Sequence, residues 1–337
     1  MDRQSWFNRA YGCLIGQAVG DALGAPTEGC SVREIRDTYG WVDDFVTDDP
    51  VGTDDTEYAM LTARIILKYG QSLAPEDMTR EWTEHLVGQE GGFYGGGFSE
   101  MDAIYNLRKG LKAPVTGSDN HEMWSDGTAM RIAPIGIYCA GDPAEAARLA
   151  GIEARVSHAR DGVYSGQALA ASVAHAMVGK DWEQVIQAGL REIPSDSWTY
   201  RKIIESVDIG LKYSDVRDAV LELHDGVSIF YYPWADVAPE ATALAYGVFA
   251  AARGEYVSSV LGGANVGRDA DTIAAMAGAM AGALHGAEAV PVSWRDQINV
   301  IRGHCIKATA GMNVAHVAEQ FVDVIMGRGS RGGTLLR

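Results

Sequence analysis

Apolar residues recur at steps of three and four positions along most of this chain. The first such stretch runs from Trp6 to Ala22. The same spacing returns in six later segments, at residues 58–67, 144–150, 165–178, 241–252, 273–284 and 314–325. This period is that of one face of an α-helix, whereas the period-two alternation that indicates strands is scarce. The pattern therefore predicts an all-α protein.

Glycine is unusually frequent for a helical protein, with 40 residues in a chain of 337. In the segment that begins near residue 273, Ala274, Gly278, Gly282 and Gly286 follow one another at four-residue steps. A glycine inside a helix costs ~1 kcal/mol relative to alanine, so tertiary packing must compensate. We therefore expect a glycine-rich core in which helices approach one another closely.

The chain shows no Pro/Ser-rich linker and no shift in composition. It is therefore predicted to form a single compact domain over residues 1–326. A split into two domains would also separate two acidic clusters that look complementary. Residues 327–337 contain the run Gly-Arg-Gly-Ser-Arg-Gly-Gly and are expected to form a flexible tail.

Charge and composition exclude several classes of protein. The formal net charge is -17, and a chain without clustered Lys and Arg does not suit nucleic acid or an anionic membrane. The longest apolar run, 273–284, is shorter than the ~20 residues that a membrane helix needs. The four cysteines form no CxxC pair, which favours reduced thiols and a cytoplasmic location. The oligomeric state stays open.

Two acidic clusters, Gly52–Thr56 and Gly267–Thr272, lie more than 200 residues apart. Each places paired carboxylates beside threonine, just ahead of a predicted helix. Helix capping explains one or two polar residues in each cluster but not all of them. Closely packed carboxylates repel one another unless a cation holds them, and hard divalent ions prefer oxygen ligands.

Together, the two clusters offer six oxygen ligands for two Mg²⁺ ions. Mn²⁺ is the alternative, and the absence of histidine near either cluster disfavours zinc. The predicted metal ligands are Thr53, Asp54, Asp55, Asp269, Asp271 and Thr272.

Four motifs in order link these clusters to a known family. They are Gly12–Glu28, Thr53–Thr56, Asp126–Gly136 and Asn265–Thr272. With these motifs the chain resembles the ADP-ribosylglycohydrolases, and the resemblance extends over residues 12–286. It implies an all-helical fold, a binuclear Mg²⁺ site and hydrolysis of the bond between C1″ of an ADP-ribosyl group and its acceptor.

The resemblance also implies roles for individual residues. It assigns the six ligands named above to the metals, and it gives Glu28, Asp54 and Asp55 catalytic roles. Carboxylates stabilise a ribosyl transition state with oxocarbenium character, and one of them deprotonates the attacking water. The alternative for Glu28 is a loop carboxylate that closes the turn after Pro26.

Three further segments are expected to contact the substrate. The loop 91–98 offers backbone amides to enclose a ligand, and Phe93, Tyr94 or Phe98 could stack on a base. The segment that begins at Ser125 opens a helix, and in the family it brings amides and a hydroxyl to the phosphates of the ligand. The predicted substrate-binding residues are Gly95, Gly96, Ser125, Asp126, Gly127, Thr128 and His158.

Asp126 stands where asparagine is common in the family. Because an extra carboxylate would repel a diphosphate, this departure favours a small unphosphorylated N-riboside as an alternative to an ADP-ribosylated acceptor. A non-catalytic relative that binds ligands or serves a structural role is a third possibility. The aromatic run 230–234 either lines a pocket or, as we expect, packs into the core as a loop.

Overall fold

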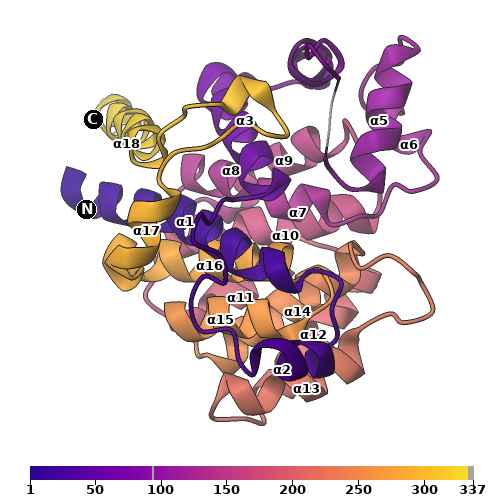
Figure 1. Ribbon diagram of the computed structural model, residues 1–337. Helices are drawn as coiled ribbons and strands as arrows, with labels where there is room; N and C mark the ends of the chain where they lie inside the picture. Colours follow the sequence, from indigo (N-terminus) through magenta and orange to yellow (C-terminus); the bar gives the residue numbers. More distant parts are fainter. Residues whose placement is uncertain (93–94, 333–337) are drawn as a thin grey trace.

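The computed structural model describes residues 1–92 and 95–332 (Figure 1). Over these residues the chain forms 18 α-helices and no β-strand, which confirms the all-α prediction. The helices are α1 (Arg3–Gly24), α2 (Val32–Tyr39), α3 (Asp54–Tyr69), α4 (Pro75–Trp82), α5 (Phe98–Arg108), α6 (Val115–Ser118), α7 (Gly127–Arg131), α8 (Ala133–Tyr138), α9 (Pro143–Ala154), α10 (Asp161–Ala176), α11 (Trp182–Arg191), α12 (Trp198–Gly210), α13 (Val216–Val227), α14 (Ala238–Ala251), α15 (Tyr256–Val266), α16 (Ala270–His285), α17 (Val292–Ile298) and α18 (Val314–Gly332). Short 3₁₀ or π segments lie at Ala25–Thr27, Gly70–Ser72, Thr83–Val87, Ala287–Ala289 and Lys307–Thr309.

Helices α1 and α16 run side by side through the middle of the molecule. In Figure 1, α3 and α8 lie above this pair, and α13 and α15 lie below it. Most residues of α1 from Ala10 onward and nearly all of α16 are buried. Neither helix has a distinct polar face, because a helix that other parts of the protein cover on all sides needs none.

Glycines make the contact between α1 and α16 exceptionally close. Gly12, Gly16 and Gly20 lie against the backbone of α16, and a Cβ atom on Gly20 would lie 2.3 Å from the carbonyl oxygen of Ala274. Gly278 and Gly282 lie in the same way against the backbone of α1. The expectation of closely packed, glycine-bearing helices is thus confirmed, and α1 supplies the partner stripe that the analysis of α16 alone did not identify.

The relative orientation of α1 and α16 determines where the acidic clusters meet. Gly12 meets Gly282 near one end of the pair, whereas Gly24 meets Ala270 near the other. The two helices are therefore antiparallel, and the C-terminal end of α1 lies beside the N-terminal end of α16. This packing brings the motif that ends at Glu28 next to the second acidic cluster.

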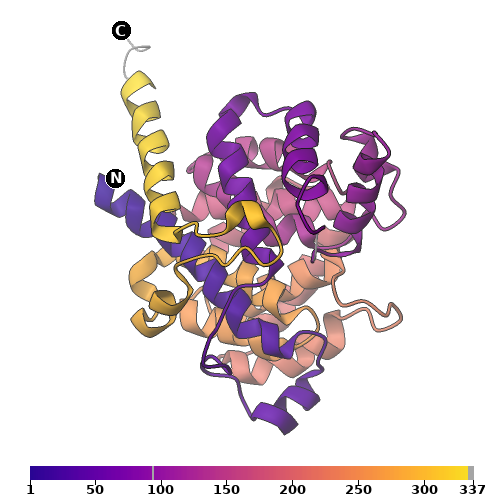
Figure 2. The same ribbon diagram turned by 45° about the horizontal axis from the view of Figure 1, so that its top comes forward.

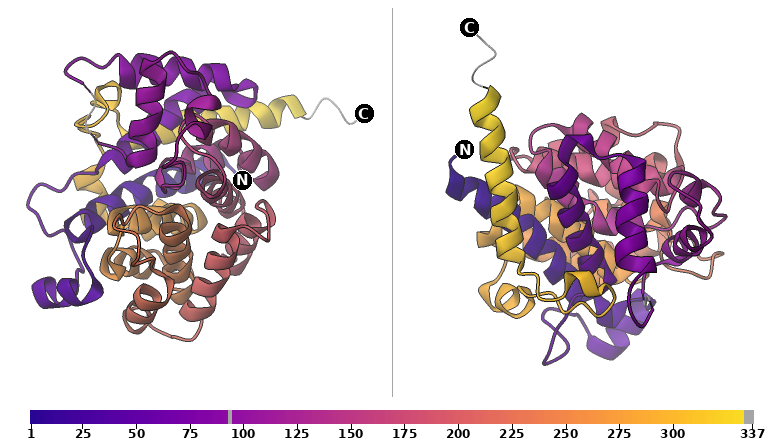
Figure 3. Two further views of the ribbon diagram at one scale, coloured as in Figure 1. Left: turned by 90° about the vertical axis from the view of Figure 1, so that its right-hand side faces the viewer. Right: turned by 90° about the horizontal axis from the view of Figure 1, so that it is seen from above.

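The two ends of the chain also meet. Helix α18 packs along the N-terminal part of α1, and Figures 2 and 3 show its far end projecting from the body of the molecule. The helix continues to Gly332, past residue 326, where we expected the domain to end. Residues 333–337 of the predicted tail lie outside the described residues. Over the described part of the chain, no helix combines the length and apolar character needed to cross a membrane.

Candidate active site

Asp21 organises the first acidic cluster. This residue lies in the last turns of α1 and is fully buried. Its carboxylate accepts hydrogen bonds from the Thr53 N–H, at 2.9 and 2.8 Å to its two oxygens, and from the Thr56 N–H at 3.1 Å. The Thr56 hydroxyl also donates to it. These bonds hold the N-terminus of α3 against the end of α1.

The first cluster then begins α3 in the predicted way. Thr53 is the N-cap, and its hydroxyl accepts a hydrogen bond from the Asp55 N–H at 3.3 Å. Asp54 and Asp55 follow in the first turn, where the helix dipole favours negative charge. Thr53 also reaches the second cluster, because its hydroxyl lies 3.4 Å from Oδ2 of Asp271.

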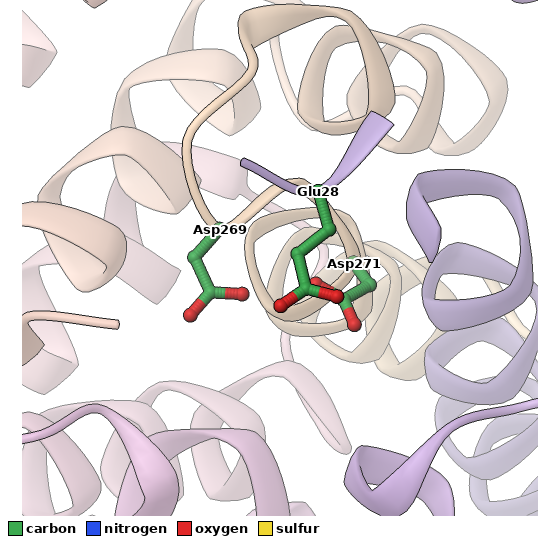
Figure 4. Close-up of side chains that lie close together, drawn as sticks. All are labelled: Glu28, Asp269 and Asp271. Atoms are coloured by element: carbon green, nitrogen blue, oxygen red, sulfur yellow. The ribbon is translucent and has the colours of Figure 1, made fainter. Parts of the chain in front are cut away.

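Glu28 approaches the second cluster from above. The Gly29 N–H donates to the carbonyl of Arg268 at 2.7 Å, and the Arg268 N–H donates to the carbonyl of Cys30 at 2.9 Å. This short pairing fixes Glu28 over the start of α16. Oxygens of Glu28, Asp269 and Asp271 lie within 4.8 Å of one another, and the three carboxylates point into the same space (Figure 4).

Asp55, Asp269 and Asp271 are buried, and no described residue places a cationic side chain beside Asp55 or Asp271. Burial raises the pKa of Asp55 well above its usual range, and the neighbouring Asp271 and Asp21 raise it further. Burial likewise raises the pKa of Asp271, with further contributions from Asp269 and Glu28. Oδ2 of Asp55 and Oδ1 of Asp271 are buried and have no hydrogen-bond partner within the described part of the chain. Because buried polar atoms in proteins are normally paired, these oxygens indicate a partner from outside the chain.

A cavity of about 610 Å³ opens above the clusters. Of the six predicted metal ligands, Asp54, Asp55, Asp269, Asp271 and Thr272 line it, and Thr53 lies just behind Asp271. The full lining is Glu28, Gly29, Asp54, Asp55, Gly95, Gly96, Gly97, Phe98, Met101, Asp126, Met130, Pro233, Trp234, Ala235, Asp236, Arg268, Asp269, Asp271 and Thr272.

Gly95, Gly96 and Gly97 of the glycine loop line one side of the cavity, and contact of Gly95 and Gly96 with a substrate stays a prediction. The Gly96 N–H donates a hydrogen bond to Asp54. Gly95 has a φ of 110°, and a Cβ there would lie 1.8 Å from Sγ of Cys305. Only glycine fits this position. Phe93 and Tyr94, which we considered for base stacking, lie outside the described residues.

The other predicted substrate residues divide into two groups. Asp126 lines the cavity, whereas Ser125, Gly127, Thr128 and His158 are buried behind its wall. Their direct contact with a substrate stays a prediction.

His158 belongs to a buried polar network that we call the Arg131 network. Its Nε2 lies 2.9 Å from the Ser125 hydroxyl and its Nδ1 lies 2.7 Å from the Ser157 hydroxyl. Arg131 hydrogen bonds to the Glu100 and Glu153 carboxylates and to Ser157. Burial lowers the pKa of His158 well below its usual value, and the Arg131 charge lowers it further. The position of His158 thus favours a structural role behind the wall.

The aromatic run 230–234 was expected to pack into the core, and this expectation is wrong. Phe230, Tyr231 and Trp234 are 57%, 84% and 56% exposed, and Pro233 and Trp234 line the cavity. The loop is fixed instead by Tyr232, which lies against Trp124 with 4.6 Å between ring centroids and donates to Glu122 at 2.7 Å. Phe230 also lies against the His224 ring and the Arg268 guanidinium, whereas Tyr231 and Trp234 face solvent.

The family model described as ADP-ribosylglycohydrolase matches residues 2–329. The chain belongs to the ADP-ribosylglycohydrolase family.

Individual similar proteins cover most of the chain. An uncharacterised protein of Archaeoglobus fulgidus is 33% identical over 84% of the chain and 88% of its own length. ADP-ribosylhydrolase ARH3 of Bos taurus is 25% identical over 86% of the chain and 88% of its own length. ADP-ribosyl-[dinitrogen reductase] glycohydrolase of Rhodospirillum rubrum is 24% identical over 89% and 93%.

A solved structure agrees with the fold. The ADP-ribosylglycohydrolase-related protein complex matches with a TM-score of 0.65 and 22% identity, over 95% of this chain and 99% of that one. Family membership confirms the resemblance that the four motifs carry, and it makes the chain a hydrolase of glycosyl bonds.

Sequence reasoning missed two acidic residues of this ADP-ribosylglycohydrolase site. Asp21 lies within the first motif but received no role, although a lone aspartate among apolar helix residues is a signal of a buried bond. Asp236 lines the cavity and follows the aromatic loop. Nothing in its local sequence sets it apart from other loop aspartates.

Proposed function

We propose that this protein is a metal-dependent glycohydrolase that cleaves the C1–N or C1–O bond of a ribosyl group. An ADP-ribosylated acceptor is the substrate that its named relatives suggest. The observation that carries the proposal is the convergence of Glu28, Asp55, Asp269 and Asp271 in one cavity, with buried carboxylate oxygens that lack a partner.

The residues fit a pair of hard divalent cations. The donors are carboxylates and threonine hydroxyls, which suit Mg²⁺ or Mn²⁺. The unpartnered oxygens of Asp55 and Asp271 are the positions that a cation would satisfy. We assign the predicted six ligands to this role, with Glu28 close enough to join them. When bound, the ions would orient the vicinal hydroxyls of the ribose.

The side chains themselves supply the remaining chemistry. A ribosyl transition state develops positive charge at the anomeric carbon, and the carboxylates of Asp54 and Asp55 would stabilise that charge. Glu28 is exposed to the cavity. Partial desolvation raises the pKa of its carboxyl group, and the negative charge of Asp54 raises that pKa further. A carboxylate with a raised pKa is better suited to take a proton from water near neutral pH. We therefore assign Glu28 as the general base.

Release of ADP-ribose from peptides tests the proposal. ADP-ribosyl-arginine and ADP-ribosyl-serine peptides are incubated with the protein and Mg²⁺ or Mn²⁺, and EDTA is added to matched samples. We expect release that EDTA abolishes. If neither these peptides nor unphosphorylated ribosides are cleaved in any metal, and removing the metal lowers only the melting temperature, the protein is a non-catalytic relative.

A small N-riboside is the second candidate. The acidic lining of the cavity favours it, since seven carboxylates surround the space that a substrate would occupy: Glu28, Asp54, Asp55, Asp126, Asp236, Asp269 and Asp271.

A further inference from the structure

Two of these carboxylates lie outside the proposed metal ligands and form one wall of the cavity. Asp126 directly precedes α7, and Asp236 lies in the loop before α14. The Asp126 N–H donates to the carbonyl of Asp236 at 3.2 Å, and Ser125 forms an isolated antiparallel bridge with Val237. The backbone therefore locks the two aspartates side by side.

The carboxyl group of Asp126 is buried, and its hydrogen bonding is incomplete. The residue is 2% exposed and lines the cavity, and its Oδ2 has no hydrogen-bond partner among the residues that the structure describes. As the N-cap of α7 it makes no side-chain capping bond, so the simple capping role does not account for it. Its other oxygen shares a hydrogen bond with Asp269. The Asp236 carboxylate accepts hydrogen bonds from its own backbone N–H and from the Phe98 N–H.

Among the described residues that line the cavity, no cationic side chain is left unpaired beside this wall. Arg268 is the one basic side chain among the described residues that line it. Its guanidinium is already bound to Glu240 and donates to the carbonyl of Trp234 at 3.1 Å. Two divalent ions would leave a surplus of negative charge among seven carboxylates. A diphosphate beside Asp126 and Asp236 would add like charge to that surplus.

We propose that Asp126 and Asp236 are a specificity pair that selects a ribosyl substrate without phosphate, whose group at this wall is cationic or donates hydrogen bonds. This inference rests on the proposed function and names the substrate class for the same cavity. A guanidinium, an ammonium or the N–H edge of a base would satisfy the open oxygen of Asp126. A site built to receive such donors rejects groups that cannot supply them.

A matched pair of substrates tests the proposal. N-ribosyl-arginine and N-(ADP-ribosyl)-arginine share the ribose and the leaving group and differ only in the ADP portion. With Mg²⁺-loaded protein, we expect kcat/KM to be at least about tenfold higher for N-ribosyl-arginine, as one like-charge contact would produce.

Variants then locate the cause. Asp126→Asn and Asp236→Asn should each shift the ratio of the two kcat/KM values about tenfold toward the ADP-ribosyl substrate, because each places a neutral amide, which can donate to phosphate, where the wild type has a carboxyl group of the same shape. Any effect of either substitution on metal affinity acts on both substrates and cancels in the ratio. Asp323→Asn, which removes the same charge from the exposed surface of α18, should leave the ratio unchanged. Calorimetric titration of ADP-ribose should show about tenfold tighter binding to each cavity variant.

Each outcome has a distinct meaning. Absence of metal-dependent cleavage of both substrates overturns the proposed function and this inference with it. Cleavage with a preference for the ADP-ribosyl substrate, or with a ratio and ADP-ribose affinity that both cavity variants leave unchanged, overturns only the inference. If Asp126→Asn fails to fold, as melting would reveal, Asp236→Asn decides alone.

Discussion

Two groups of buried carboxylates lie on either side of the wall of the cavity, and they differ in how their charge is balanced. Behind the wall, Glu100 and Glu153 are fully buried, and both bind the guanidinium of Arg131. Facing the cavity, Asp55 and Asp271 are also buried, but the charged groups that act on them among the described residues are other carboxylates.

The difference separates structure from function. A carboxylate whose counter-charge is built into the chain contributes to a stable interior, even though burial raises the pKa of Glu100 to about 7 against the opposing effect of Arg131. A cluster without a counter-charge costs stability, and it persists because a ligand outside the chain completes it. The charge balance of a buried acid thus indicates whether its partner is internal or bound.

The largest effect should come from breaking the Arg131 network. Arg131→Met keeps the length of the side chain but leaves two buried carboxylates unpaired, so the free energy of unfolding should fall by about 3–5 kcal/mol. Urea denaturation in the presence and absence of Mg²⁺ measures this loss, which metal should not restore.

A surface pair provides the control for Arg131→Met. Arg148 pairs with Glu145 on α9, and its side chain is 49% exposed. Arg148→Met should cost less than about 1 kcal/mol. Equal losses in the two variants would mean that burial does not distinguish the pairs.

Neutralising a cavity carboxylate should have the opposite effect on stability. Asp271→Asn removes one of the repelling charges, so the metal-free protein should gain about 1 kcal/mol. Turnover should nevertheless fall about 10²- to 10³-fold, as it does when a preorganised electrostatic contact is lost. Steady-state kinetics and EDTA-treated melting curves measure both quantities. A variant with wild-type turnover would refute the role of Asp271 in the site.

Glu28 should behave differently from the ligands beneath it. Glu28→Gln preserves the shape of the side chain but cannot take a proton, so turnover should fall about 100-fold, at the lower end of what a general base contributes. The melting-temperature increase on adding Mg²⁺ should remain. Glu183→Gln, on the exposed face of α11, serves as the charge-matched control. Loss of the Mg²⁺ effect in Glu28→Gln would make Glu28 a ligand rather than the base.

How much of the fold and of the candidate site the sequence could predict depended on how far apart in the chain the contributing residues lie. The long helices α1, α3, α10, α14 and α16 were predicted because each buries a continuous apolar face. Short helices such as α7 and α8 carry too few residues for a period to be read, and tertiary contacts hold them. The two acidic clusters were paired correctly in advance, since their chemistry is complementary.

The unpredicted parts depend on contacts between distant segments. Asp21 bonds to Thr53 and Thr56, and this bond is visible only once α1 and α3 meet. The sequence also does not distinguish Asp126, which faces the cavity, from Ser125 beside it, which is buried behind the wall. Neighbours in the chain can lie on opposite sides of a wall, and only the fold decides which one can reach a substrate.

The pH dependence of stability tests the same contrast without changing the cavity ligands, at on the order of 1.4 kcal/mol per pH unit for each proton. Burial raises the pKa of Asp21 from 3.8 to about 7. Between these values the folded, metal-free protein holds a proton that the unfolded chain releases, so its stability should fall as pH rises from about 4 to about 7. Asp21→Asn lacks this titrating group. Its free energy of unfolding should therefore change less steeply with pH, by the contribution of one proton. Urea denaturation in EDTA across this range measures both slopes.

Saturating Mg²⁺ should make the stability of the wild-type protein depend less on pH, because the metal binds only to deprotonated ligands. A metal-free protein that became more stable with rising pH would place the counter-charge of the cavity inside the chain, and the contrast with the Arg131 network would disappear.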